Sequence, residues 1–156
     1  MSGGRIPELI TAALQRVARL FRRQPGGPAH LRTGLKGEDM AYYFLRRQGY
    51  TIVARNWRCK GRKGEVDLIG WDGKTLCFIE VKTRRSRAVA TAESAIDHPK
   101  QVELRGMATL FLRHQNPQPL CRFDVVGIYL IPGAEPEIQL FKDAFPWRSM
   151  GGKRRL

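Results

Sequence analysis

Three charged residues interrupt two apolar, strand-like runs that an Asp-Gly turn separates. Asp67 lies in the first run, E-V-D-L-I-G-W, and Glu80 and Lys82 lie in the second, L-C-F-I-E-V-K. Core strands normally exclude such groups, because burying an unpaired carboxylate is costly. Paired carboxylates are the hard oxygen ligands that Mg²⁺ and Mn²⁺ prefer, and a neighbouring lysine can orient a water or stabilise charge on a phosphate. These residue types indicate metal-assisted hydrolysis of a phosphodiester bond.

The turn between the two runs predicts how these charges face one another. Asp72-Gly73 is typical of a two-residue hairpin loop, which pairs Asp67 with Phe78 and Glu65 with Glu80. Because side chains alternate along a strand, one face then carries Glu65, Asp67, Glu80 and Lys82. Asp67 and Glu80 become diagonal neighbours, with Cα atoms about 7–8 Å apart. The alternative is a solvated strand face with Glu–Lys pairs, but the agreement of three charges with one register favours a site.

Glu38 is a further acidic candidate, on a helix expected over residues 36–48. It shares a helix face with Ala41, Tyr42 and Leu45, at the spacing of residues that pack inward. An acid on this face could reach the same metal. The alternative is stabilisation of the helix dipole in the first turn, worth about 0.3–1 kcal/mol, and spacing alone leaves the two interpretations nearly even.

The other elements expected from periodicity and turn residues give the order α-β-β-β-α-β. The helix ends at Gly49, and the strands and helix that surround the hairpin are expected over 50–55, 99–114, 123–131 and 137–141. The strand over 123–131 is a continuous apolar run, which predicts burial on both faces. The predicted fold class is therefore α/β, with a mixed central sheet flanked by helices.

The composition favours a folded, nucleic-acid-binding protein. The chain has 156 residues, a formal net charge of +14 and a pI of about 10.6. Its 42% hydrophobic residues exclude a disordered basic tail, and a basic globular domain meets nucleic acid, an acidic membrane surface or an acidic protein. The three cysteines form neither a zinc pattern nor a disulfide set, which favours a reducing, cytoplasmic location. No apolar run approaches the roughly 20 residues that span a bilayer.

Three segments are expected: a helical arm with a Pro/Gly linker over 1–28, a domain over 29–146 and a basic flexible tail over 147–156. The arm is an amphipathic pattern with an arginine-rich face, which Q-P-G-G-P ends at residues 24–28. This pattern is similar to an organelle transit peptide or a membrane-surface helix. Packing on the domain or on a partner is the favoured interpretation.

Basic residues cluster on both sides of the charged hairpin. The set expected to contact nucleic acid comprises Arg55, Arg58, Arg62, Lys63, Arg84, Arg85 and Arg87. Any one of them alone is typical of a solvated surface. Together with the large positive charge they predict a surface that holds the phosphates of a nucleic acid strand.

Several short motifs resemble those of one family. They are L-K-G-E (35–38), Q-G-Y (48–50), R-N-W-R (55–58), G-E-V-D-L-I (64–69), F-I-E-V-K-T-R (78–84), K-Q (100–101) and C-R-F-D-V-V (121–126). Together they resemble the YraN-like family, small bacterial proteins regarded as predicted endonucleases. Asp67 followed by Glu80-Val81-Lys82 is also similar to the PD-(D/E)xK motif of restriction-endonuclease-like nucleases, with Val66 in place of the proline.

The resemblance implies a restriction-endonuclease-like fold, distantly similar to archaeal Holliday-junction resolvases. By this resemblance Asp67 and Glu80 bind Mg²⁺ or Mn²⁺, Lys82 serves the water or the phosphate, Glu38 is an accessory acid and metal ligand, and Gln101 faces the site. The expected activity is cleavage of branched, flapped or single-stranded DNA, and resolving a junction would need two sites on a homodimer. The alternative is a non-catalytic nucleic-acid-binding module that retains the scaffold.

Overall fold

The computed structural model describes residues 29–86 and 96–147. The chain divides into two compact units, residues 1–36 and 37–156. Within the described residues, the first unit contributes only the beginning of helix α2, Ala29–Arg47. The predicted N-terminal helix and linker, and the tail from residue 148 onward, lie outside the described residues. No helix of the described part is long and apolar enough to cross a membrane.

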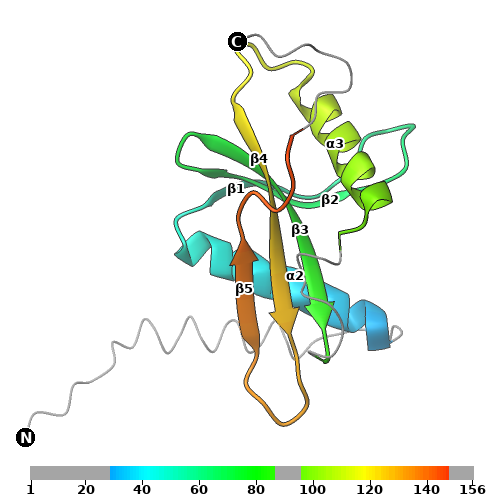
Figure 1. The fold of residues 1–156 in the computed structure, drawn as a ribbon, viewed down its shortest axis with the longest axis vertical. Coiled ribbons are helices and arrows are strands. Elements are labelled where there is room, and N and C mark those ends of the chain that lie inside the picture. The colour runs from blue at the N-terminus through cyan, green and yellow to red at the C-terminus, as the bar shows by residue number, and fades with distance from the viewer. Residues whose placement is uncertain (1–28, 87–95, 148–156) are drawn as a thin grey trace, which may run out of the picture. The chain divides into compact units, whose positions relative to one another are not determined.

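The second unit is built on a five-stranded sheet whose strands follow one another in chain order (Figure 1). The strands are β1 Thr51–Trp57, β2 Val66–Asp72, β3 Thr75–Arg84, β4 Leu120–Tyr129 and β5 Glu137–Phe141. Strands β3 and β4 are parallel, and helix α3, His98–Leu112, lies between them in the chain; the other neighbours are antiparallel. The predicted mixed α/β sheet with two flanking helices is confirmed.

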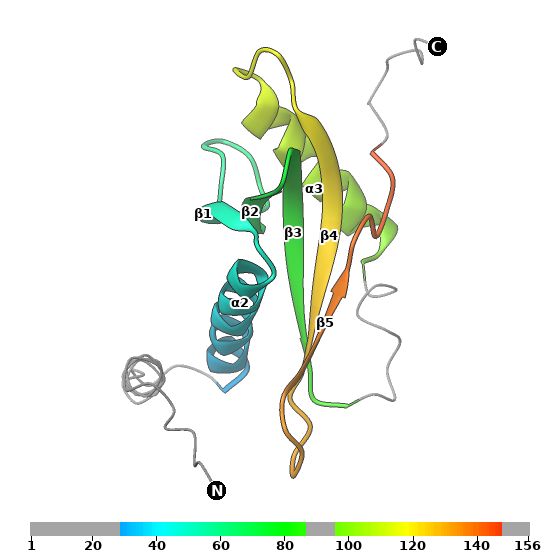
Figure 2. The same cartoon turned by 90° about the vertical axis from the view of Figure 1, so that its left-hand side faces the viewer.

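Two hydrophobic clusters assign one helix to each face of the sheet. Residues 37–47 of α2 supply Ala41 and Leu45 to a cluster that contains Leu68 and Ile79. Helix α3 supplies Leu104 and Met107 to the other cluster, which contains Ile69, Phe78 and Phe123. Figure 2 shows α3 on the opposite side of β3 and β4 from α2. Because both of its faces are covered, β4 is buried continuously over residues 123–129, as its apolar run predicts.

The ends of the helices follow local signals in the sequence. Helix α2 ends at Arg47, and Gly49 has a φ of +90°, a value that glycine adopts without a steric penalty. Asp97 is the N-cap of α3, where its side chain accepts a hydrogen bond of 2.9 Å from the backbone N–H of Lys100. Pro99 lies in the first turn, as the sequence predicts.

The predicted register of the β2–β3 hairpin is wrong by two residues. Asp72 pairs with Thr75, so that Gly73 and Lys74 form the loop. Gly73 has a φ of +59°, which fits the first position of a type II′ loop, and glycine therefore occupies that position instead of the second. As a result Ile69, and not Asp67, lies opposite Phe78. A shift of two residues leaves every side chain on its predicted face, because the period of a strand is two.

Candidate active site

Asp67 and Glu80 lie on neighbouring strands, on the sheet face that α3 covers. The pairing of β2 with β3 runs from Asp72–Thr75 to Leu68–Ile79, and Asp67 and Glu80 are the next residue of each strand. Their carboxylates are close enough for the charge of Glu80 to raise the pKa of Asp67. Asp67 is 8% exposed and Glu80 is 3% exposed. Two carboxylates are thus buried side by side.

Three polar groups contact this carboxylate pair. The backbone N–H of Val81 donates a hydrogen bond of 2.7 Å to Asp67 Oδ2. The ammonium of Lys82 donates one of 2.7 Å to Glu80 Oε1, as its predicted position on the same face requires. The ammonium of Lys100, from the first turn of α3, lies 3.4 Å from Glu80 Oε2. That oxygen is buried and accepts no hydrogen bond from any described residue.

The surroundings of Asp67 disfavour its charged form. Burial, followed by the negative charge of Glu80, raises the pKa of Asp67 to about 7, although the hydrogen bond from Val81 opposes this rise. The charge of Glu38 raises the pKa of Asp67 further, and the charge of Lys100 lowers it. A cation placed between the two acids would favour the charged form of both.

The donor set fits a hard divalent cation. Both acids offer carboxylate oxygens, and among residues 29–86 and 96–147 nothing donates a hydrogen bond to the buried Oε2 of Glu80. Within residues 29–86 and 96–147, no three His, Cys, Asp or Glu side chains come together as a metal-binding group. Asp67 and Glu80 would therefore hold Mg²⁺ or Mn²⁺ with water and phosphate oxygens completing the shell, which is how these ions are usually bound.

Glu38 acts on this pair through its charge. It belongs to α2, whose residues 37–47 pack on the opposite face of the sheet, and its side chain is half-buried. Burial raises the pKa of Glu38, a hydrogen bond with Asn56 lowers it, and the charge of Glu65 raises it. Glu38 therefore reaches Asp67 electrostatically but forms no three-acid cluster with Asp67 and Glu80.

Helix α3 carries the predicted Gln101 and its neighbour Lys100 in its first turns. Gln101 donates a hydrogen bond of 3.1 Å to the Ile96 carbonyl and accepts one of 3.1 Å from Arg105. Lys100, its neighbour, is the α3 side chain that contacts Glu80. The sequence reasoning missed Lys100, although the start of the helix near Pro99 would have placed this residue in the first turn.

The predicted nucleic-acid contacts fall into separate groups. Arg58, Arg62 and Lys63 line one pocket beside α3. Arg55 pairs with Asp39 of α2, and its guanidinium lies 4.7 Å from the centre of the Tyr42 ring.

The remaining three predicted contacts follow β3. Arg84 ends this strand on the same face as Glu80 and Lys82 by alternation, and its Nε atom is buried without a hydrogen-bond partner among the described residues. Arg85 is exposed, and Arg87 lies outside the described residues. Three of the seven predicted contacts thus share one pocket.

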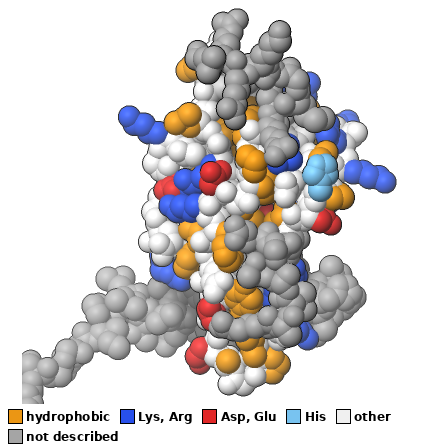
Figure 3. Space-filling model, viewed as in Figure 1, with side chains coloured by type: hydrophobic (Ala, Val, Ile, Leu, Met, Phe, Trp, Pro, Cys, Tyr) orange, Lys and Arg blue, Asp and Glu red, His pale blue; other side chains and the backbone are white. Residues whose placement is uncertain are grey.

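A second polar cluster surrounds Asp124, a fully buried residue of β4. Asp124 accepts hydrogen bonds from Tyr50 (3.0 Å), Arg122 (2.7 Å) and the backbone N–H of Asp143 (3.0 Å). Arg122 also pairs with Asp72 at 2.6 Å, and Figure 3 shows acidic and basic side chains adjoining on this face. Since its carboxylate is satisfied by these donors, the cluster is structural.

The sequence model of the uncharacterised protein family UPF0102 matches residues 37–128. The chain belongs to this family. Asp67, Glu80, Lys82 and Lys100 all lie in the matched region. The motif resemblance to the YraN-like family is thereby confirmed at the level of the UPF0102 family.

Individual UPF0102 proteins are similar over most of their length. One from Koribacter versatilis is 52% identical over 122 residues, which cover 78% of this chain and 85% of the relative. One from Nocardia farcinica is 45% identical over 113 residues, which cover 72% of this chain and 87% of the relative. One from Solibacter usitatus is 41% identical over 133 residues, which cover 85% of this chain and 97% of the relative.

Proposed function

We propose that this UPF0102 protein is an endonuclease that hydrolyses phosphodiester bonds in DNA with Mg²⁺ or Mn²⁺, on a scaffold of the restriction-endonuclease type. One observation carries the proposal: two buried carboxylates, Asp67 and Glu80, lie close together on neighbouring strands, with the Lys82 ammonium 2.7 Å from Glu80. Burying two like charges together is unfavourable unless a cation is bound between them.

Each residue has a definite task in this proposal. Asp67 and Glu80 hold the cation, which when bound supplies a Lewis acid and an activated water. Lys82 orients the water or donates to a phosphate oxygen as charge develops there. Glu38, within electrostatic reach of Asp67, acts through the outer hydration of the site. Gln101, whose amide bonds to the Ile96 carbonyl and to Arg105, is the predicted α3 residue that faces the site.

The substrate follows from the charge of the chain. With a net charge of +14 and basic side chains beside the acids, the protein suits a polyanionic strand. Branched, flapped or single-stranded DNA is the proposed class, and the protein would act in the cytoplasm. Resolution of a four-way junction would require two copies that present two sites. The N-terminal arm would contact a partner or a membrane surface.

A second candidate is a nucleic-acid-binding module without catalysis. It is favoured by one specific observation: an ammonium lies near each oxygen of Glu80, Lys82 at 2.7 Å and Lys100 at 3.4 Å. These two cations partly neutralise the acids without a metal. Such a module would bind nucleic acid equally well with and without Mg²⁺.

Cleavage assays distinguish the two candidates. The purified protein is incubated with labelled junction, flap, single-stranded and duplex DNA, and with RNA, in Mg²⁺, Mn²⁺ or EDTA. We expect cleavage to require the metal. We expect Asp67→Asn and Glu80→Gln to abolish it. Asp72→Asn is the matched control, because it removes one carboxylate charge at the hairpin end, among Arg122 and Lys142. Binding without cleavage on every substrate would leave the binding module as the function.

A further inference from the structure

A pocket of about 430 Å³ lies beside the acidic pair, between the β1–β2 loop and the start of α3. Its lining residues are Arg58, Arg62, Lys63, Gly64, Glu65, Lys100 and Glu103. Lys100 lines the pocket and also contacts the acidic pair, since its ammonium lies 3.4 Å from Glu80 Oε2. A group bound in this pocket is therefore separated from the carboxylate pair by one side chain.

Two glycines hold the loop closely against α3. A Cβ atom on Gly64, which has a φ of +111°, would lie 2.7 Å from Cγ and Cδ of Glu103. A Cβ atom on Gly106 of α3 would lie 2.2 Å from Nη2 of Arg62. The Arg62 guanidinium thus rests directly on the helix backbone. The loop and the helix approach closely here, and a larger residue at either position would displace the side chain of Glu103 or Arg62 from the pocket.

The charges of the pocket are unbalanced. Four basic and two acidic side chains line it, which leaves a net charge of +2. Arg58 pairs with Glu65 at 2.5 Å, and Lys100 pairs with Glu103 at 2.7 Å. Arg62 and Lys63 form no ion pair with any other described side chain, and both are exposed. A guanidinium and an ammonium that share one cavity are suited to the oxygens of a phosphate group.

We propose that this pocket is a phosphate subsite that holds a phosphodiester next to the one placed at Asp67 and Glu80, in the same nucleic acid strand. Arg62 and Lys63 bind its oxygens, and Lys100 lies between the two phosphates as a positioning residue. The inference rests on the proposed function, because the Asp67–Glu80 site defines which phosphate is the neighbour. It assigns the first step of substrate recognition to the backbone of one strand and not to its bases.

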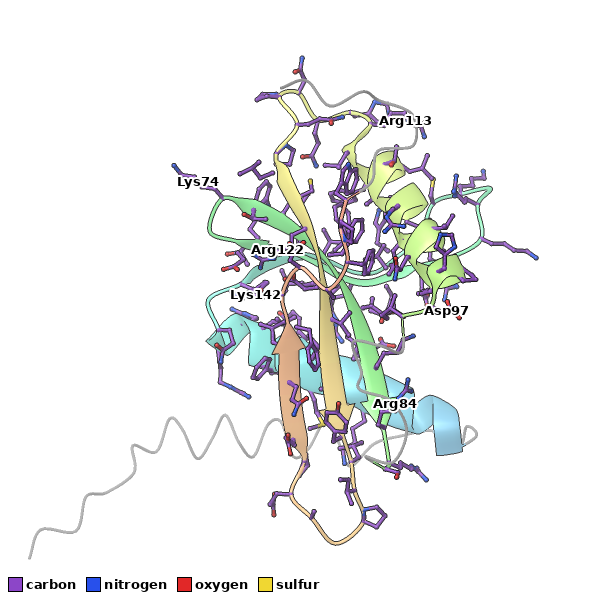
Figure 4. All side chains as sticks on the ribbon, in the orientation of Figure 1. Lys74, Arg84, Asp97, Arg113, Arg122 and Lys142 are labelled. Atoms are coloured by element: carbon purple, nitrogen blue, oxygen red, sulfur yellow. The ribbon has the colours of Figure 1, made fainter. Side chains whose placement is uncertain are left out.

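Binding without metal tests the subsite independently of cleavage. The probe is a fluorescein-labelled oligothymidine of about 20 nucleotides, longer than the usual footprint of a single-strand-binding domain. Its affinity is measured by anisotropy in EDTA over a series of salt concentrations. Lys63→Ala is compared with Lys74→Ala, which removes the same charge at the β2–β3 loop. Lys74 points away from the fold, far from Asp97 and the start of α3 in Figure 4.

We expect Lys63→Ala to weaken binding and to reduce the slope of log affinity against log salt by about 0.7, the contribution of one phosphate in a single strand. Lys74→Ala should leave the slope unchanged. Equal losses in both variants, or no loss in either, would overturn the subsite. Thermal unfolding followed by circular dichroism checks that both variants fold, and both lysines are exposed.

Lys100→Met tests whether the subsite adjoins the acidic pair. This variant should lose oligothymidine affinity and also change the Mn²⁺ concentration at which the protein is half-saturated, whereas Lys63→Ala should change affinity alone. A Lys100→Met protein with the Mn²⁺ titration of the wild type would disprove the adjacency. If Lys63→Ala shows its slope change but the wild type cleaves nothing, the proposed nuclease fails and the phosphate site itself stands.

Discussion

The ammonium of Lys100 lies 3.4 Å from Oε2 of Glu80, on the other side of this carboxylate from Lys82. The contact joins α3 to the two strands that carry the acids. Lys100 therefore lies between two regions of opposite charge. The buried acidic pair attracts a cation, and the basic pocket attracts an anion. A phosphodiester bound through a metal ion satisfies both, because it brings its own negative charge.

Replacing Asp67 by asparagine should stabilise the protein at neutral and higher pH. The pKa of Asp67 is raised to about 7 in the folded protein, so the folded state binds a proton more tightly than the unfolded chain does. The free energy of unfolding contributed by this group therefore falls as the pH rises from about 4 to about 7. Asp67→Asn removes this loss, worth on the order of 1–4 kcal/mol.

Urea unfolding in EDTA at about pH 5 and about pH 8 measures this difference. Asp72→Asn should instead lower the free energy of unfolding at the higher pH. Hydrogen bonds from Arg122 and Lys142 lower the pKa of Asp72, so its charge stabilises the fold at that pH. A wild type and an Asp67→Asn variant with the same pH dependence would refute the prediction.

Divalent cations should stabilise the wild type and leave the variants of the acidic pair unaffected. A ligand that binds only the folded state adds about 2.7 kcal/mol at one hundred times its Kd. We expect Mn²⁺ to raise the Tm of the wild type and of Asp72→Asn, but not of Asp67→Asn or Glu80→Gln. Differential scanning fluorimetry over a metal series makes the comparison. A Tm increase that survives in Asp67→Asn would place the ion elsewhere.

Lys82→Met should separate catalysis from binding. The variant keeps both acids and most of the side-chain volume, but it loses the ammonium that lies 2.7 Å from Glu80 Oε1. Removing one preorganised donor of this kind slows a reaction by about 10²–10³. Single-turnover cleavage should slow by this factor, while the Mn²⁺-induced Tm increase remains. Unchanged cleavage by Lys82→Met would exclude Lys82 from the reaction.

Gly106→Ala should weaken nucleic acid binding without weakening the fold. The new Cβ atom would collide with the end of the Arg62 side chain, a flexible group that can move away. Alanine is favoured over glycine within a helix by about 1 kcal/mol, so the free energy of unfolding should be equal or higher. Oligothymidine affinity should fall, because Arg62 leaves the pocket. Unaltered affinity would show that the position of Arg62 on α3 has no role in binding.

Asp124→Ala should destabilise the protein strongly. The change leaves Arg122, Tyr50 and the N–H of Asp143 without their shared acceptor in the interior. Breaking a buried charge pair from one side costs about 3–5 kcal/mol. Lys142→Ala, which removes a half-exposed partner of Asp72, should cost much less. Urea unfolding of the two variants gives the comparison, and equal losses would contradict it.

The sequence predicted the sheet because its strands carry strong local signals. The edge strand over 137–141 and the buried run of β4 are both found where the apolar pattern placed them. The face shared by Asp67, Glu80 and Lys82 was also predictable, since alternation depends only on the parity of the register. The register itself could not be predicted. Asp72-Gly73 indicated a turn but did not decide which loop position glycine would occupy.

The contacts between distant elements were not predictable from local patterns. Lys100 reaches Glu80 only because α3 packs on one particular face of β3, and this choice depends on the whole core. Glu38 has the spacing of an inward-facing residue, but spacing alone did not reveal that its charge acts on Asp67. The pocket depends likewise on the contacts of Gly64 with Glu103 and of Gly106 with Arg62, which arise through packing and not through sequence proximity.

The basic loop between β1 and β2 has a consequence for how such proteins can diversify. The acids lie on β2 and β3 inside the sheet, where a change of residue disturbs the core. Arg58, Arg62 and Lys63 follow the edge strand β1, and surface loops tolerate substitution and changes of length. Descendants of one ancestor could therefore acquire new substrate preferences through this loop while inheriting the same chemistry.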